Sequence, residues 1–189
     1  MRFRNSTFFA SLQYYGSGGT TFRENDKHLQ GQMFTTIENL HESAKKRLAQ
    51  SWATSCYRNF VQRIRESDFA PLYSDKHSPP NTPVNILVGL EALKSGFGWS
   101  DEILYDEFLF NIKIRYTFGL HDLDEGYFDL RTLYYFRKAL TDYEKSKKIN
   151  LIAECFKNIT DAQLDDFVLK TGIQRMDSTL IQSNICNLP

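Results

Sequence analysis

Hydrophobic residues recur at helical spacing along most of this chain, and the clearest case lies in its middle. Ile86, Leu87, Leu90 and Leu93 follow the spacing of a helix that is apolar on most of its surface. Two glycines within residues 95–98 then break the pattern. The segment therefore predicts a buried core helix.

A second helical run follows directly after that break. Ser100 has the character of an N-terminal cap, and two acidic residues come next, where negative charge complements the exposed amides of a first turn. Apolar positions continue at helical spacing from Ile103 to Phe118. Gly119 suits the left-handed C-cap that would end this helix.

The same periodicity covers the first half of the chain. It predicts one helix from about Thr36 and a second amphipathic helix that begins after Ser51 and ends near Ser67. Residues 71–83 contain four of the five prolines. Because proline restricts its own backbone and that of the preceding residue, we expect a loop there.

Three more helices are predicted in the second half. Asp129 is placed to cap a long helix whose buried stripe includes Leu133, Phe136 and Leu140. A shorter helix is expected over residues 151–159. A capping box beginning at Thr160 then predicts a separate helix that leads to residue 171.

After Gly172 the composition changes to residues that suit an extended segment, which predicts one short β-strand. The expected fold is mostly α. Its parts are a flexible N-terminal arm (1–32), an all-α domain (33–171) and a C-terminal piece (172–189) that contains the strand.

Composition narrows the class of protein only slightly. The 189 residues carry no net charge and have an estimated pI of 6.9, so the global balance gives no argument for nucleic acid. Three widely spaced cysteines indicate neither a disulfide framework nor a zinc site. No stretch approaches the ~18 apolar residues of a membrane span, so a soluble, cytoplasmic protein without a membrane partner is expected.

The charges are nevertheless distributed unevenly. Residues 101–129 hold eight acids against two basic residues, whereas residues 41–65 hold a single acid. Six basic residues stand in that second segment and form one candidate DNA-binding surface: Lys45, Lys46, Arg47, Arg58, Arg63 and Arg65. Ordinary solvated helix faces remain the alternative explanation.

The predicted helix over residues 131–148 offers another candidate surface. Arg131, Lys138 and Lys145 are seven residues apart, so they follow nearly one line along a helix, away from its apolar stripe. Intrahelical pairing with Asp142 is the alternative. Arg137 belongs to the same candidate set, and it could instead pair with an acid of residues 101–129.

Asp177 is the residue with the clearest candidate chemistry. It lies in the predicted strand, and a carboxylate there needs solvent, hydrogen bonds or a metal ion. Metal-dependent phosphoryl chemistry uses such a group as a hard oxygen ligand. One carboxylate does not make a metal site, however, and an aspartate in a strand-end turn remains the alternative.

Three motifs occur in a defined order: the apolar helix 85–93, the segment 116–120 (Tyr-Thr-Phe-Gly-Leu), and the helix 129–137 with Asp129, Thr132 and Phe136. This order resembles the N-terminal domain of bacterial insertion-sequence transposases of the InsH type. In that family the following catalytic domain is RNase H-like and carries an Asp-Asp-Glu triad. Residues 176–179 (Met-Asp-Ser-Thr) resemble the context of its first aspartate.

The resemblance implies a role in DNA transposition. Asp177 would be a catalytic residue and a ligand for Mg²⁺ or Mn²⁺ in the full-length family, with the partner being duplex DNA at terminal inverted repeats. The second Asp and the Glu have no counterpart before Pro189. We therefore expect a truncated chain that binds DNA, binds no metal, lacks strand-transfer activity, and associates with itself or with full-length transposase.

Two alternatives remain at this point. One is a helical protein–protein interaction module in which the acidic segment 101–129 and the basic segment 41–65 satisfy each other across an internal interface. The other is a helix-turn-helix DNA-binding protein, which only the short break at residues 96–98 supports.

Overall fold

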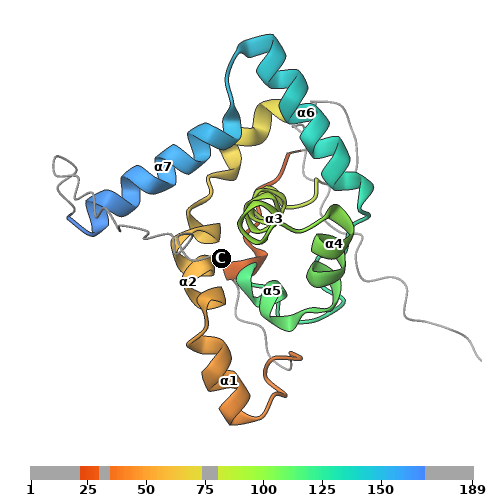
Figure 1. Ribbon diagram of the computed structural model, residues 1–189, viewed down its shortest axis with the longest axis vertical. Helices are drawn as coiled ribbons and strands as arrows, with labels where there is room; N and C mark the ends of the chain where they lie inside the picture. Colours follow the sequence, from red (N-terminus) through yellow and green to blue (C-terminus); the bar gives the residue numbers. More distant parts are fainter. Residues whose placement is uncertain (1–21, 30–34, 74–80, 169–189) are drawn as a thin grey trace, which may run out of the picture.

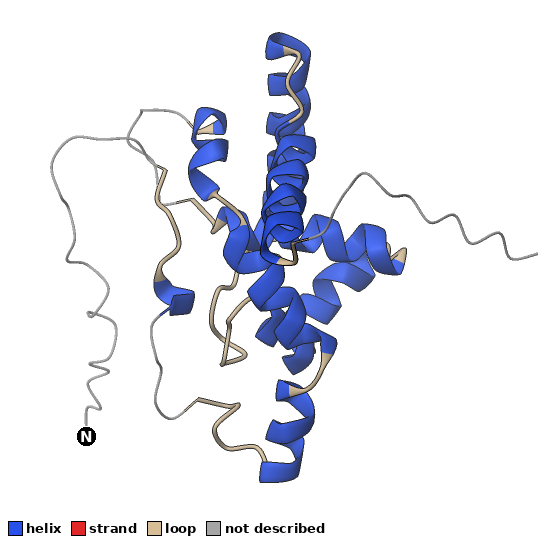
Figure 2. Cartoon of the chain, turned by 90° about the vertical axis from the view of Figure 1, so that its left-hand side faces the viewer, coloured by secondary structure: helices blue, strands red, loops and turns tan. Residues whose placement is uncertain are grey.

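The computed structural model describes residues 22–29, 35–73 and 81–168, and within these ranges all regular secondary structure is helical (Figure 2). This confirms the predicted mostly-α fold. The strand predicted after Gly172 lies outside the described residues. The described elements are η1 (Lys27–Leu29), α1 (Glu42–Ala49), α2 (Trp52–Asn59), η2 (Val61–Arg63), η3 (Glu66–Leu72), α3 (Val84–Phe97), α4 (Asp101–Phe110), α5 (Ile112–Thr117), α6 (Arg131–Lys147) and α7 (Leu151–Asp166).

The predicted core helix is α3, which lies near the centre of the molecule with α2, α4, α5 and α6 around it (Figure 1). Every residue from Val84 to Leu90 is buried. A helix that is apolar on most sides needs neighbours on most sides, and this requirement explains its central position. The helix ends at Gly98, whose φ of 66° is the left-handed conformation that glycine adopts without strain.

The predicted helix over residues 101–118 is in fact two helices, α4 and α5. Its caps are confirmed, because the Ser100 side chain accepts a hydrogen bond from the amide of Ile103 and Gly119 has a φ of 72°. The break falls at Asn111, whose backbone is extended. Its Oδ1 accepts from the amides of Lys113 and Ile114, at 2.9 and 3.4 Å. The asparagine ends α4 and caps α5, which hydrophobic periodicity alone does not reveal.

Two predicted boundaries in the first half were also wrong. The helix expected from Thr36 begins at Glu42, because residues 36–39 form a turn. Asp122 holds this turn: the Asp122 Oδ1 accepts a hydrogen bond from the Thr36 amide at 2.5 Å and one from the Thr36 hydroxyl at 2.7 Å. The helix expected to reach Ser67 ends at Asn59. Phe60 leaves the helical conformation there, and the 3₁₀ helices η2 and η3 follow.

After residue 150, a single helix, α7, stands where two helices were predicted. Helix α7 runs from Leu151 through Thr160 to Asp166, and the Thr160 hydroxyl donates to the Phe156 carbonyl at 2.8 Å instead of capping a new helix. Asp129 performs its predicted role approximately, since its Oδ1 accepts from the Arg131 amide at 2.8 Å just before α6.

The helices are arranged along an elongated molecule (Figure 1). α1 forms one end and α6 lies towards the other, while α7 returns from the end of α6 across η3. None of the helices in the described ranges has the length and apolar character needed to cross a bilayer.

Candidate nucleic-acid interface

The outward side of α6 carries a row of basic side chains. Arg131, Lys138 and Lys145 are all exposed, while Leu133 and Phe136 on the opposite side are buried in the core. Residues seven apart lie nearly above one another on an α-helix. The exposed row that the sequence predicted is therefore present.

Two tyrosines accompany this row and were not predicted. Tyr134 is 44% exposed and Tyr135 is 68% exposed, and both fall outside the apolar stripe. Their positions three and four residues after Arg131 place them beside the basic row. The set Arg131, Tyr134, Tyr135, Lys138 and Lys145 is called the α6 face below. The positions of the two tyrosines in the helical repeat could have identified them. They fall on the polar side of an amphipathic helix, where packing in the core does not account for an aromatic residue.

The basic side chains of the α6 face are not neutralised by neighbours within the described part of the chain. No ion pair to another described residue involves Arg131, Lys138 or Lys145, and Asp142, the pairing partner considered from the sequence, is exposed on the same side without forming one. Three cations and one acid thus share this side of the helix. The result is a local positive surface on a chain with no net charge.

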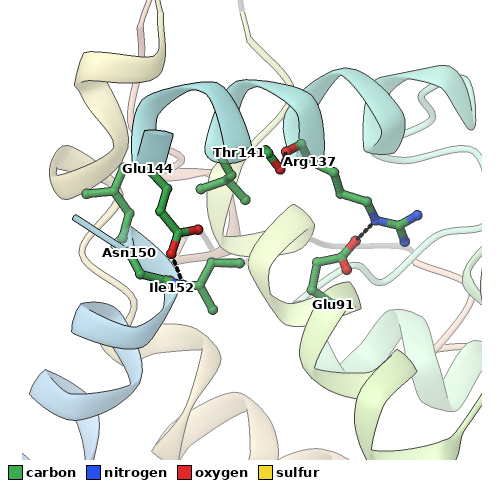
Figure 3. A pocket seen from close by; sticks show the side chains of 8 residues that line it. Glu91, Arg137, Thr141, Glu144, Asn150 and Ile152 are labelled. Carbon is green, nitrogen blue, oxygen red and sulfur yellow. Dashed lines mark hydrogen bonds and ion pairs between the residues drawn. The ribbon is translucent and has the colours of Figure 1, made fainter. Parts of the chain in front are cut away.

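Arg137 lies beside the α6 face, with its guanidinium 5.7 Å from the centre of the Tyr134 ring, and it fixes α6 to the rest of the molecule. Its Nε lies 2.7 Å from Glu91 of α3 (Figure 3), and a terminal nitrogen lies 2.7 Å from Asp101 of α4. Lys94 also contacts Asp101 at 2.7 Å. These interactions match the alternative considered from the sequence, in which Arg137 pairs with an acid of residues 101–129 instead of belonging to the DNA-binding set, and they leave its charge paired.

The electrostatics of this cluster follow from its geometry. Hydrogen bonding from Arg137 is the main cause that lowers the pKa of Asp101 to about 2, with Lys94 adding to it. Hydrogen bonding to Asp101, with Glu91 adding to it, raises the pKa of Arg137 above its ordinary value. Since Leu133 and Phe136 on the opposite side of the helix are buried in the core, α6 presents its outward residues from a fixed support.

A pocket of about 260 Å³ lies beside Arg137, where α6 meets the start of α7 (Figure 3). It is lined by two carboxylates, Glu91 and Glu144, and by Thr141, Asn150 and neighbouring apolar side chains. Glu91 is bound to Arg137, and Glu144 accepts a hydrogen bond from the side-chain Nδ2 of Asn150 at 3.2 Å. None of its lining residues, which also include Arg137, belongs to the α6 face, so the pocket is separate from that face.

The structure distributes the second predicted basic set over α1, α2, η2 and the residue that precedes η3. Half of it is engaged: Lys45 lies 3.0 Å from Glu42 and 3.6 Å from Glu38, Arg65 lies 3.6 Å from Asp68, and Arg63 pairs with Asp166 of α7. The other three residues are exposed and form no ion pair with a described residue: Lys46, Arg47 and Arg58. The set is therefore less uniform than the α6 face.

The ion pairs of Asp101, Arg63 and Arg65 do not run between the acidic and the basic segment of the alternative hypothesis. The ion pairs that Asp101 forms run to Lys94 and Arg137, neither of which belongs to the basic segment 41–65. Arg63 and Arg65 pair with Asp166 and Asp68. These four ion pairs do not join the two segments, although the pair between Arg137 and Asp101 is one that the sequence had suggested.

Asp177 lies outside the described residues, and its predicted catalytic and metal-binding role stays a prediction. Within the described ranges, no group of three or more His, Cys, Asp or Glu side chains is arranged to hold a metal ion. A comparison with protein-family models, curated proteins and solved structures found no match to this chain.

Proposed function

We propose that this chain is a helical DNA-binding protein whose α6 face contacts the phosphate backbone of a duplex. The observation that carries the proposal is the row Arg131, Lys138 and Lys145, which is exposed, free of ion pairs with the other described residues, and held on a helix that Arg137 and two buried side chains fix to the core. Phosphate contacts need cations that project together from a rigid support.

The dimensions of the row suit a duplex. At a rise of about 1.5 Å per residue, Arg131 and Lys145 are about 21 Å apart along the helix axis. That length corresponds to about six base pairs at 3.4 Å each. Tyr134 and Tyr135 add hydroxyl groups, which also donate to phosphate oxygens in protein–DNA contacts.

Salt dependence provides the sharpest test of this proposal. Each neutralised phosphate contributes about −0.9 to the slope of log K against log salt, so three contacts contribute about −2.7. Replacing all three basic residues by glutamine should remove that part of the slope and weaken binding roughly 500-fold at about 0.1 M salt. Fluorescence anisotropy with a labelled duplex measures both quantities.

A matched control is available at the other end of the molecule. The triple variant Lys46→Gln, Arg47→Gln, Arg58→Gln removes the same net charge from exposed positions of α1 and α2. We expect it to retain most of the affinity and of the slope. If wild-type chain does not bind duplex at low salt, or if the two triple variants lose affinity equally, the proposed role of the α6 face is wrong.

The proposal extends to the kind of DNA. The motif order of residues 85–137 resembles the N-terminal domain of InsH-type transposases, and a domain of that kind would bind the ends of its own element. Selection of bound duplexes from a random pool tests this part separately. Enrichment of one sequence supports recognition of element ends, whereas equal retention of all sequences would leave only backbone binding by the α6 face.

A further inference from the structure

Helix α4 has an outward side of a different character. Ile103 is 50% exposed and Phe110 is 74% exposed, although both are large apolar residues. They are seven residues apart and so lie on the same side of the helix, opposite the buried Leu104 and Phe108.

Two acidic residues border these apolar side chains. Glu102 and Asp106 are exposed, and neither forms an ion pair with another residue of the described ranges. Asp101, by contrast, is occupied by Lys94 and Arg137. The set Glu102, Ile103, Asp106 and Phe110 is called the α4 face below. Single exposed apolar residues are common, but an apolar pair with unpaired acids defines a surface of distinct chemistry.

The α4 face and the α6 face are complementary. One offers two apolar side chains with two acids, and the other offers two tyrosines with three cations. The apolar pair Ile103 and Phe110 and the basic row of α6 are each spaced by seven residues, the repeat at which two helices pack along one another in a coiled coil. The chain also carries no net charge, so no general repulsion keeps copies apart.

We propose that the α4 face of one copy of this chain binds the α6 face of a second copy. Such a contact is head-to-tail, because each copy uses a different surface toward each neighbour, and it generates rings or open chains. It uses the α6 face as a surface but does not depend on that face binding DNA. Where DNA does bind, the duplex and the second copy exclude each other from α6.

Charge reversal tests the pairing. Sedimentation velocity of the wild-type chain at low salt should show an average mass that rises with protein concentration and falls as salt is added. Reversing the acids with Glu102→Lys and Asp106→Lys should weaken association at least about tenfold, and reversing the bases with Arg131→Glu and Lys138→Glu should do the same, since each change places like charges opposite one another.

The equimolar mixture of the two reversed variants is the decisive measurement. The reversed α4 face of one is then complementary to the reversed α6 face of the other, and the remaining pair of faces also has opposite charge. Association should return in the mixture while each variant alone stays largely monomeric. The control variant Glu154→Lys, Asp161→Lys on exposed positions of α7 should associate like wild type.

Specific outcomes would overturn this proposal. A wild-type chain that stays monomeric at every concentration, a mixture that does not regain mass, or a control variant that loses association equally would each exclude the α4–α6 contact. The acid-reversed variant keeps the α6 face intact, so its DNA affinity reports on the proposed function independently. Loss of self-association with retained DNA binding, or the reverse, therefore separates the two proposals.

Discussion

At the scale of single residues, a buried arginine organises the acidic connection between α5 and α6. The Arg115 guanidinium donates to the carbonyl of Phe108 at 3.1 Å, to the carbonyl of Asp122 at 2.9 and 2.7 Å, and to the carbonyl of Glu125. Burial lowers the pKa of this side chain from its ordinary value, while the nearby acids raise it. The planar, forked arrangement of donors is what lets one side chain hold three separate parts of the backbone.

Arg115→Lys tests this role without removing the charge. A lysine ammonium is a point donor and cannot reach all three carbonyls, so buried acceptors are left without partners. We expect a loss of about 2–4 kcal/mol in the free energy of unfolding, measured by urea denaturation. The control Arg58→Lys, at an exposed position, should change it by less than about 0.5 kcal/mol. Equal effects of the two substitutions would contradict the proposed role.

Glu66 is a second buried charged residue, and it joins the start of α3 to the segment around residue 25. One carboxylate oxygen accepts from the Asn25 amide at 3.1 Å and the other accepts from the Val84 amide at 2.9 Å. These bonds favour the charged form, but burial is the larger effect and raises the pKa of Glu66 above its ordinary value of 4.5.

The raised pKa of Glu66 predicts how the free energy of unfolding changes with pH. The folded state holds the Glu66 proton more strongly than the unfolded chain does, so the associated stabilisation is fully present below about pH 4.5 and is lost as pH rises through the folded pKa. Glu66→Gln removes this titration. The wild-type advantage in unfolding free energy over the variant should therefore shrink as pH rises from 4.5 toward 7. Urea denaturation at several pH values measures it, and an advantage that grows with pH would contradict the prediction.

At the scale of elements, the two glycines of α3 show how packing decides what a helix tolerates. A Cβ added at Gly89 would lie 2.5 Å from Cε1 of Phe118, whereas a Cβ at Gly96 would meet nothing within 4 Å. The same chemical substitution in one helix therefore faces a filled space at one position and an open one seven residues later.

Alanine at these two positions should have opposite effects. Gly89→Ala gains up to about 1 kcal/mol of helix propensity but forces the buried Phe118 ring to move, which costs about 1–3 kcal/mol, so a net loss is expected. Gly96→Ala meets no obstacle and should stabilise by up to about 1 kcal/mol. Thermal denaturation of both variants measures the difference. A stabilising Gly89→Ala would show that the Phe118 ring moves freely.

The elements also show what the sequence could predict. Helix α3, the break at residues 95–98 and the cap at Ser100 depend on local chemistry, and the hydrophobic pattern together with residue type identified them. The break at Asn111 and the turn held by Asp122 depend on side-chain hydrogen bonds, one of which spans 86 residues. Periodicity carries no information about such bonds, so the helix boundaries predicted at these two places were wrong.

The candidate DNA-binding site on α6 also has one part that the sequence predicted and one part that it did not. The basic row of α6 follows from seven-residue spacing on one helix, and the structure confirms its exposure. Arg137 belonged to the same sequence pattern but is bound by Glu91 and Asp101, which come from other elements. Sequence left two interpretations of Arg137, DNA contact or pairing with an acid, and its contacts with other elements were needed to show that it pairs.

At the scale of the whole molecule, burial falls from the centre to the ends. Helix α3 contributes eight buried residues and lies in the middle, whereas α1 contributes none and forms one end of the molecule (Figure 1). α7 is intermediate: Leu151, Cys155 and Ile159 are buried. Because local stability follows the number of buried apolar contacts, the helices are expected to open independently at the periphery and together at the core.

Hydrogen exchange followed by mass spectrometry should show this gradient directly. Amides of α1 (Glu42–Ala49) should exchange fastest among the described α-helices, because their opening exposes no core residue, and amides of α3 (Val84–Phe97) should exchange slowest, because they open only with the whole core. The variant Arg137→Ala provides an internal check, since it releases the contacts of α6 with Glu91 and Asp101 and should accelerate exchange in α6 while leaving α1 unchanged. Equal protection of α1 and α3 would mean that α1 is held by contacts other than those of the described residues, and unaltered exchange in α6 would mean that Arg137 is not its support.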